Sequence, residues 1–119
     1  MARDAPVIEA TGQGSFRLSG QRWEGSLLIL ADAAQAWPVS EMSDLTLAAF
    51  DPVVAHGRAE VEFVLLGTGA RNVLPSRAVR EGLRAAGLGL ECMDTPSAAR
   101  LYNLLTSEGR RLAAALIAV

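Results

Sequence analysis

The chain has 119 residues, of which 50% are hydrophobic and 20% charged, and its net charge is −2. This length suffices for one domain, residues 1–119, with its own core, and the composition is unlike that of disordered chains. A slightly negative chain without any Lys lacks the clustered positive charge that nucleic-acid binding requires.

The charges are unevenly distributed along the chain. Residues 1–69 hold four Arg and nine Asp or Glu, whereas residues 70–119 hold seven Arg and four Asp or Glu. The basic half would suit an acidic partner or an anionic membrane surface. An ordinary solvated helix face is the simpler explanation.

The sequence predicts a cytoplasmic location with at most peripheral membrane contact. Cys92 has no second Cys with which to pair, as is usual in a reducing compartment. Residues 1–6 are polar and no apolar segment follows them, so we expect no signal peptide. No apolar run reaches the length that crosses a bilayer.

The first part of the chain predicts a hairpin and an interior strand. Residues 7–8 are expected to pair at a sheet edge, and residues 15–30 predict a hairpin that turns at 20–21. Within it, the apolar run Leu27–Leu30 predicts a strand inside the sheet. Residues 31–40 are expected to form a connection.

Residues 45–56 predict a short helix in one or two pieces, which Gly57 ends. Ser43 or Thr46 is expected to cap its start. Three apolar residues at helical spacing form its expected buried face: Leu47, Phe50 and Val54.

Residues 61–69, with the sequence V-E-F-V-L-L-G-T-G, predict the central strand and the turn that ends it. An apolar run without polar alternation indicates a strand buried on both faces. Helices and strands then alternate: helix 75–86, strand 88–93, helix 96–108 and strand 112–119. This order predicts parallel strands with right-handed crossovers and helices that cover the sheet, which becomes mixed through the N-terminal hairpin.

Three details of this second half depend on the predicted sheet. Glu91 is expected to be partly buried, unless it pairs with an Arg or lies at an exposed strand end. Asp94 is expected to cap a helix that buries Leu101, Leu104 and Leu105. Residues 112–119 are Ala-rich and would also suit a helix, but they lack a polar face and therefore predict a buried strand.

No arrangement of catalytic residues stands out, so the sequence favours a non-catalytic protein over an enzyme. The turn at residues 67–69 is neither a dinucleotide-binding nor a Walker motif, and no Lys is present to reach a phosphate. His56 is expected at the surface, and Cys92 as a packed core thiol. No set of metal ligands is present, so we expect no metal, nucleotide or other cofactor.

The predicted site lies where two parallel strands end. Strands 61–66 and 88–93 would place their following turns at one sheet edge, with free backbone N–H groups and two Thr hydroxyls. The alternative is that both turns have only a structural role. The candidate binding residues, of which the last lies about two turns into the following helix, are Gly67, Thr68, Gly69, Met93, Asp94, Thr95 and Asn103.

Three separated motifs resemble a known family. They are L-L-G-T-G at residues 65–69, L-E-C-M-D-T at 90–95, and A-A-R-L-Y-N at 98–103. In these motifs the chain resembles the small proteins of domain of unknown function 498, which include the mitochondrial assembly factor 3 of respiratory complex I. Trp23 stands where this resemblance leads us to expect a tyrosine.

The resemblance implies a three-layer α/β fold with a mixed, largely parallel central sheet. For function it implies a non-catalytic interaction protein that helps to assemble a membrane respiratory complex or membrane-protein machinery. The implied partner is a subunit of that complex or a second assembly factor, at the inner membrane, with this chain a monomer or homodimer. The alternative is a small-molecule-binding enzyme with its pocket at residues 67–69 and 93–95.

Overall fold

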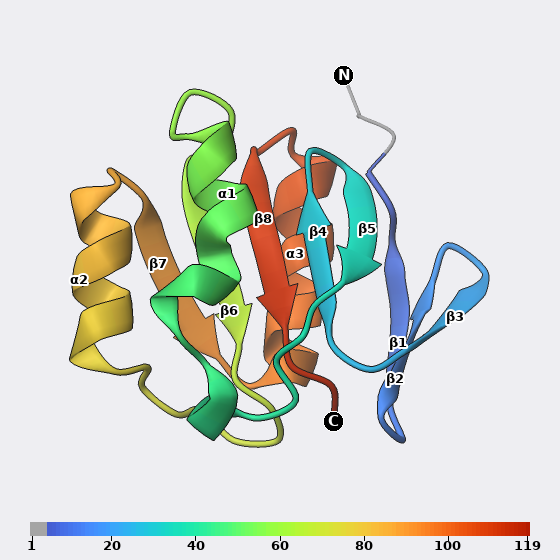
Figure 1. The fold of residues 1–119 in the computed structure, drawn as a ribbon. Helices are drawn as coiled ribbons and strands as arrows, with labels where there is room; N and C mark the ends of the chain where they lie inside the picture. Colours follow the sequence, from blue (N-terminus) through green and yellow to red (C-terminus); the bar gives the residue numbers. More distant parts are fainter. Residues whose placement is uncertain (1–4) are drawn as a thin grey trace.

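A computed structural model describes residues 5–119, so the prediction made on residues 1–6 lies mostly outside the described residues. Within residues 5–119 there are eight strands, three α-helices and two short 3-10 helices, and Figure 1 shows how they are arranged. In chain order they are β1 (Ile8–Gly12), β2 (Ser15–Leu18), β3 (Gln21–Glu24), β4 (Leu27–Leu30), β5 (Ala33–Ala36), η1 (Met42–Asp44), η2 (Leu47–Phe50), α1 (Asp51–His56), β6 (Phe63–Gly67), α2 (Arg77–Ala85), β7 (Gly89–Met93), α3 (Thr95–Ser107) and β8 (Leu112–Leu116).

The main sheet is mixed and has the strand order β5-β4-β8-β6-β7. Strand β6 runs parallel to both β7 and β8, while β4 is antiparallel to β8 and β5. Helices α1 and α2 lie on one face of the sheet and α3 on the other (Figure 1). The predicted three-layer α/β fold is therefore confirmed, and β8 is the predicted strand rather than a helix.

The interior strands are apolar without interruption because each face of the sheet is covered. Along β8, Ala113 and Ala115 face the core under α1 and α2, whereas Ala114 and Leu116 face the core under α3. All four are fully buried. Strands β4 and β6 alternate in the same way, which explains their continuous apolar runs.

The N-terminal strands form a second sheet, with the order β1-β2-β3. The predicted hairpin is confirmed for β2 and β3, but β4 belongs to the main sheet, so the hairpin does not extend over residues 15–30. Strand β1 lies at an edge, as predicted for residues 7–8. Strand β5 lies within the predicted connection, and its sequence A-A-Q-A lacks the β-branched residues that would have indicated a strand.

The predicted helix over residues 45–56 is divided into η2 and α1, and Pro52 stands in the first turn of α1. Phe50 and Val53 are its buried residues, whereas Leu47 and Val54 are exposed, so the predicted apolar face is wrong for two of its three members. Thr46 precedes η2 without a side-chain cap. Leu47 instead lies against Gly82 of α2, where a Cβ atom would collide with it.

The prediction for the buried face of α3 is wrong for Leu104 and is borne out only in part for Leu101 and Leu105, which pack against the core at its margin. Leu104 is 55% exposed, and Leu101 and Leu105 are half-buried. Small and polar residues face the sheet instead: Thr95, Ala98, Ala99, Tyr102 and Thr106. Small side chains bring the helix close to the sheet, which leaves the leucines at the margin. None of the helices within residues 5–119 is long and apolar enough to cross a membrane.

Candidate functional site

The turns that follow β6 and β7 meet at the carboxyl end of the sheet, as predicted. Gly67 and Met93 are paired at the ends of these parallel strands. The N–H of Thr68 donates to the carbonyl of Met93 at 2.8 Å, and the N–H of Thr95 donates to the carbonyl of Gly69 at 2.8 Å. Two of the backbone N–H groups that we expected to be free therefore hold the two turns together.

The hydroxyl of Thr95 connects three segments. Its oxygen accepts a hydrogen bond from the N–H of Gly69 at 3.0 Å and donates one to the carbonyl of Ile117 at 2.6 Å. Thr95 is fully buried, so water cannot replace either bond. The turn after β6, the start of α3 and the residue after β8 are thus joined through one oxygen atom, and we call this contact the Thr95 junction.

The hydroxyl of Thr68 holds the loop that follows β6. It accepts a hydrogen bond from the N–H of Val73 at 3.1 Å. The carbonyls of Arg71 and Met93 lie within donor range of the same hydroxyl. Both Thr hydroxyls of the predicted site are therefore engaged within the fold.

The glycines at this edge allow close approach. A Cβ atom on Gly67 would lie 2.9 Å from the Thr95 hydroxyl oxygen and 2.9 Å from a methyl carbon of Leu116. Gly69 has a φ of +105°, in the region that favours glycine. The glycines thus allow α3 to begin directly against the end of β6.

Asp94 caps α3, as predicted. Its carboxylate accepts hydrogen bonds from the backbone N–H of Ser97 at 2.9 Å and from the hydroxyl of Ser97 at 3.0 Å. These two bonds, the backbone bond first, hold the pKa of Asp94 below its ordinary value.

The other titratable residues considered from the sequence do not gather near Asp94. Glu91 is exposed on the outer strand β7, so the expectation of partial burial is wrong. Burial raises the pKa of the half-buried Cys92 thiol, which suits a packed thiol rather than a nucleophile. His56 is exposed, as predicted. Within residues 5–119 no three His, Cys, Asp or Glu residues are grouped as a metal site would require.

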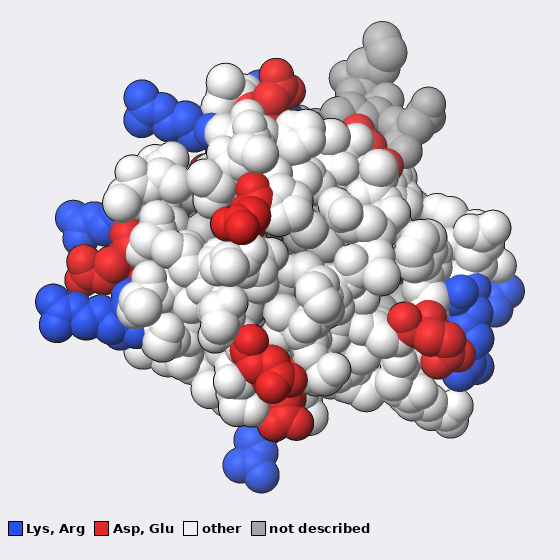
Figure 2. Space-filling model, viewed as in Figure 1, with Lys and Arg blue, Asp and Glu red and all other residues white. Residues whose placement is uncertain are grey.

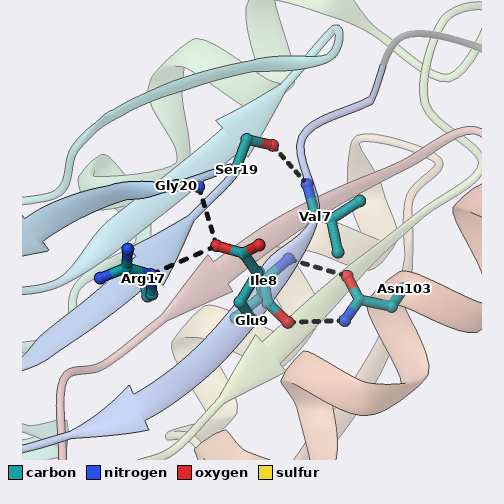
Figure 3. A network of polar contacts seen from close by, with 7 residues as sticks. All are labelled: Val7, Ile8, Glu9, Arg17, Ser19, Gly20 and Asn103. Carbon is teal, nitrogen blue, oxygen red and sulfur yellow. Dashed lines mark hydrogen bonds and ion pairs between the residues drawn. The ribbon is translucent and has the colours of Figure 1, made fainter.

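Asn103 lies apart from the other candidates, at the N-terminal sheet. Its amide oxygen accepts the N–H of Ile8 at 2.9 Å, and its amide nitrogen donates to the carbonyl of Ile8 at 2.8 Å (Figure 3). The hydroxyl of the adjacent Tyr102 donates to the carbonyl of Pro6 at 2.8 Å. These three bonds, which we call the β1 anchor, attach the start of β1 to α3.

A second network in Figure 3 attaches β1 to its own hairpin. Ser19 and Val7 exchange two hydrogen bonds, and the carboxylate of Glu9 accepts the N–H of Gly20 at 2.8 Å. Arg17 lies 3.6 Å from the same carboxylate. Strand β1 is therefore fixed on both sides.

Beside the Thr95 junction lies an open groove of about 660 Å³. Thr68 and Gly69 are the predicted site residues that line it. The other lining residues were missed by the sequence reasoning because they follow β8 or come from segments whose position depends on strand order: Ser40, Glu41, Met42, Ala70, Arg71, Val73, Ile117 and Ala118. The sequence did hold one signal of this surface, the apolar pair at residues 73–74 in a loop. Both side chains are exposed.

Much of one face of the molecule carries no charged side chains. Figure 2 shows a broad uncharged area over the centre of the face that carries α1, interrupted by acidic side chains. The blue side chains lie at its margins, including those next to α2. In α2, Arg77 and Glu81 form an exposed ion pair with N and O atoms 3.1 Å apart.

Comparison with known proteins identifies the family. The model of a protein family of unknown function, DUF498/DUF598, matches residues 8–117. The chain belongs to this family. The residues matched include both sheets and all three α-helices, so the family match covers nearly the whole described fold.

Two curated relatives and one solved structure illustrate the family. An uncharacterised protein of Rhodobacter capsulatus is 38% identical over 112 residues, which cover 92% of this chain and 82% of that protein. The zebrafish (Danio rerio) protein named NADH dehydrogenase [ubiquinone] 1 alpha subcomplex assembly factor 3 is 33% identical over 111 residues. These cover 93% of this chain but only 63% of the zebrafish protein. A Mth938-like domain of Bordetella pertussis, 28% identical, superposes with a TM-score of 0.83 over 99% of this chain and 89% of that one.

Proposed function

We propose that this protein is a non-catalytic assembly factor for a membrane respiratory complex of the complex I type. It would bind a protein partner, either a subunit of that complex or a second assembly factor. It would act on the cytoplasmic side, in peripheral contact with the inner membrane. The name of the zebrafish relative supports the assembly role, although this chain spans less than two thirds of that relative.

The observation that carries the proposal is the groove beside the Thr95 junction. Its lining combines the exposed Val73, the half-buried Met42 and the buried Ile117 with the charged residues Glu41 and Arg71. Exposed apolar side chains with charged neighbours are typical of surfaces that bind other proteins. Val73 and the adjacent Leu74 are exposed although the loop is fixed by the Thr68 hydroxyl, so the surface is preorganised.

The alternative, an enzyme that binds a small molecule at the same edge, has less support. The groove is large enough for a small ligand. However, both Thr hydroxyls and the N–H groups of Thr68, Gly69 and Thr95 are bonded within the fold. Glu41 lines the groove, but its carboxylate accepts a hydrogen bond from the hydroxyl of Ser43 at 2.6 Å, and Asp94 is occupied as a helix cap. The alternative would be favoured by a small molecule that remains bound through purification and is absent from a variant whose groove is disrupted.

A matched pair of variants tests the proposal. Val73 in the groove and Val54 on α1 are 43% and 40% exposed, so Val73→Asp and Val54→Asp introduce the same charge at similar exposure on different surfaces. In the native host, deletion of the gene should lower NADH:ubiquinone oxidoreductase activity and the amount of assembled complex in membranes. The Val54→Asp protein should restore both and the Val73→Asp protein should restore neither, although both variants should melt within a few degrees of the wild type.

Two results would contradict the proposal. Unchanged complex assembly after gene deletion would remove the assembly role. Equal restoration by the two variants would remove the groove as the docking surface, because the charge at Val73 would then be harmless.

A further inference from the structure

Strand β7 is an outer strand of the main sheet and leaves backbone groups unpaired. It pairs with β6 on one side, and within residues 5–119 no strand pairs with its other side. The N–H and C=O of one strand residue point to the same side of the strand, and successive residues alternate. The carbonyl of Met93 accepts from Thr68 and so points toward β6. The N–H and C=O of Leu90 and Cys92 therefore point outward.

The side chains of this edge define what a partner must carry. Leu90 and Cys92 are half-buried and pack against the core under α1 and α2. Between them, Glu91 is exposed on the opposite face of the strand and makes no ion pair within residues 5–119. A cross-strand neighbour of opposite charge would stabilise a strand added at this edge.

We propose that β7 binds an extended segment of another protein, which adds to the sheet as a sixth strand. The segment carries Lys or Arg opposite Glu91, between apolar residues that lie beside Leu90 and Cys92. Four backbone hydrogen bonds, from the N–H and C=O groups of Leu90 and Cys92, supply the pairing. Basic and apolar residues in alternation supply the specificity, as in other cases of strand addition.

A second copy of this chain fits the edge less well. An antiparallel pair of β7 strands that uses all four outward groups pairs Leu90 with Cys92 and places Glu91 directly opposite Glu91. Like charges at this spacing destabilise the pair. Registers centred on Leu90 or on Cys92 leave only two bonds within the strand, because the next outward residues, Leu88 and Asp94, lie outside it. The N–H of Leu88 donates to the carbonyl of Leu83, and the carbonyl of Asp94 accepts from the N–H of Ala98. The charge at Glu91 thus selects a basic segment and disfavours self-pairing.

The other outer strand of this sheet, β5, lacks these properties. It has four residues, Ala, Ala, Gln and Ala, and carries no charge. Ala34 packs against the core under α3 and shares a hollow with Trp23 of the N-terminal sheet. Strand β7 is therefore the edge with both free backbone groups and an unpaired charge.

The test is the selection of peptides from a random heptapeptide library displayed on phage, with the full chain as bait. Selected peptides should alternate apolar residues with a central Lys or Arg. Binding of one such synthetic peptide should weaken about fivefold or more in Glu91→Lys, because attraction becomes repulsion. When the Glu91→Lys protein is the bait, the selected peptides should instead carry a central Asp or Glu. Glu60→Lys changes the net charge equally at an exposed residue outside β7 and should bind the peptide as the wild type does.

Backbone variants and amide exchange identify where the peptide lies. Cys92→Pro removes an outward N–H and should abolish binding while the chain remains folded, since proline is tolerated on the open side of an edge strand. In the wild type the peptide should slow hydrogen exchange at Leu90 and Cys92. If Cys92→Pro fails to fold, the effect of Glu91→Lys on peptide binding and the pattern of amide exchange still show whether the peptide binds at β7.

Three results of the peptide experiments would overturn the proposal. They are selection without basic enrichment, binding that Glu91→Lys leaves unchanged, and slowed exchange in the loop at residues 70–73 instead of β7. The last result would place the peptide in the groove and would leave the proposed assembly function intact. A dimer at micromolar concentration that Glu91→Lys dissociates or strengthens would show that a second copy occupies the edge. The inference does not depend on the proposed function. The peptide experiments test β7 and the complementation experiment tests the groove, so the failure of one proposal leaves the other standing.

Discussion

Helix α3 is fastened to distant parts of the chain at two places, and the two differ in burial. At the Thr95 junction one fully buried hydroxyl bonds to the backbone of Gly69 and Ile117. At the β1 anchor, two turns further along, Tyr102 and Asn103 bond through three atoms to the backbone of residues 6 and 8. The first joins segments of the main sheet and the second attaches a separate small sheet.

The comparison shows that the same bond type has different consequences at different depths. Backbone groups that lose a partner in the fully buried junction cannot reach water, so the full cost of desolvation remains. The bonds of the anchor are only partly buried, because Pro6 and Asn103 are half-buried although Ile8 is buried, and water can replace part of what the anchor supplies. We therefore expect the junction to control global unfolding and the anchor to control the attachment of β1.

The largest expected effect is that of Thr95→Val, which keeps the side-chain shape and removes the hydroxyl. The N–H of Gly69 and the carbonyl of Ile117 would then be buried without this partner, at a cost of about 3 kcal/mol in the free energy of unfolding. Urea unfolding followed by circular dichroism measures the change. Thr95→Ser should recover most of the loss, because it restores the hydroxyl.

Thr106→Val is the matched control for this prediction. Thr106 is also buried on α3, but its hydroxyl donates to the carbonyl of Tyr102 one helical turn earlier. That carbonyl lies where it also accepts the helical backbone bond, so we expect a loss below about 1 kcal/mol. Equal losses at the two threonines would show that the junction does not fasten the sheet.

The next largest effect is expected for Asn103→Leu, which removes both bonds to Ile8 and keeps an apolar side chain at a half-buried position. We expect a loss of about 2 kcal/mol from the two hydrogen bonds to Ile8, and about 1 kcal/mol for Tyr102→Phe from the bond to the carbonyl of Pro6. Amide exchange of β1 should accelerate more than exchange of β6 in both variants. Uniform acceleration in both strands would show that the small sheet does not detach separately.

The interior strands of the main sheet, β4, β6 and β8, were predictable because they are buried on both faces. The runs at residues 27–30, 61–66 and 112–119 are apolar over consecutive positions, and such runs indicate interior strands without knowledge of their neighbours. The meeting of the turns after β6 and β7 followed from their being successive parallel strands. The helix cap at Asp94 and the glycines at 67 and 69 are local signals, and they could likewise be identified from the sequence.

The remaining features depend on contacts between distant segments. Ile117 enters the Thr95 junction because β8 lies next to β6, and strand order cannot be read from a run of apolar residues. The centre of the face of α3 that packs on the sheet has small and polar residues, so the leucine pattern indicated only the margin of that face. Asn103 was included in the site because its place along α3 was known and its partner, Ile8, was not.

The smallest expected effect concerns Asp94, which lies at the surface end of the Thr95 junction. Its pKa is lowered in the folded protein because the carboxylate accepts hydrogen bonds from the N–H and hydroxyl of Ser97, so the folded state binds a proton less readily than the unfolded state. This stabilisation is fully present above the ordinary carboxyl pKa of 3.8 and is lost as the pH falls through the lower folded value.

The pH dependence should therefore separate the charge of Asp94 from its capping geometry. Asparagine caps helices about as well as aspartate but carries no charge, so Asp94→Asn should differ from wild type most above pH 4 and progressively less at more acidic pH. Ser97→Ala removes only the hydroxyl donor and should reduce the pH-dependent part by less than half, since the backbone N–H is the larger cause. Thermal unfolding between pH 2 and pH 6 measures all three proteins. A constant difference between wild type and Asp94→Asn over that range would show that charge contributes nothing and that Asp94 acts only through the geometry of the cap.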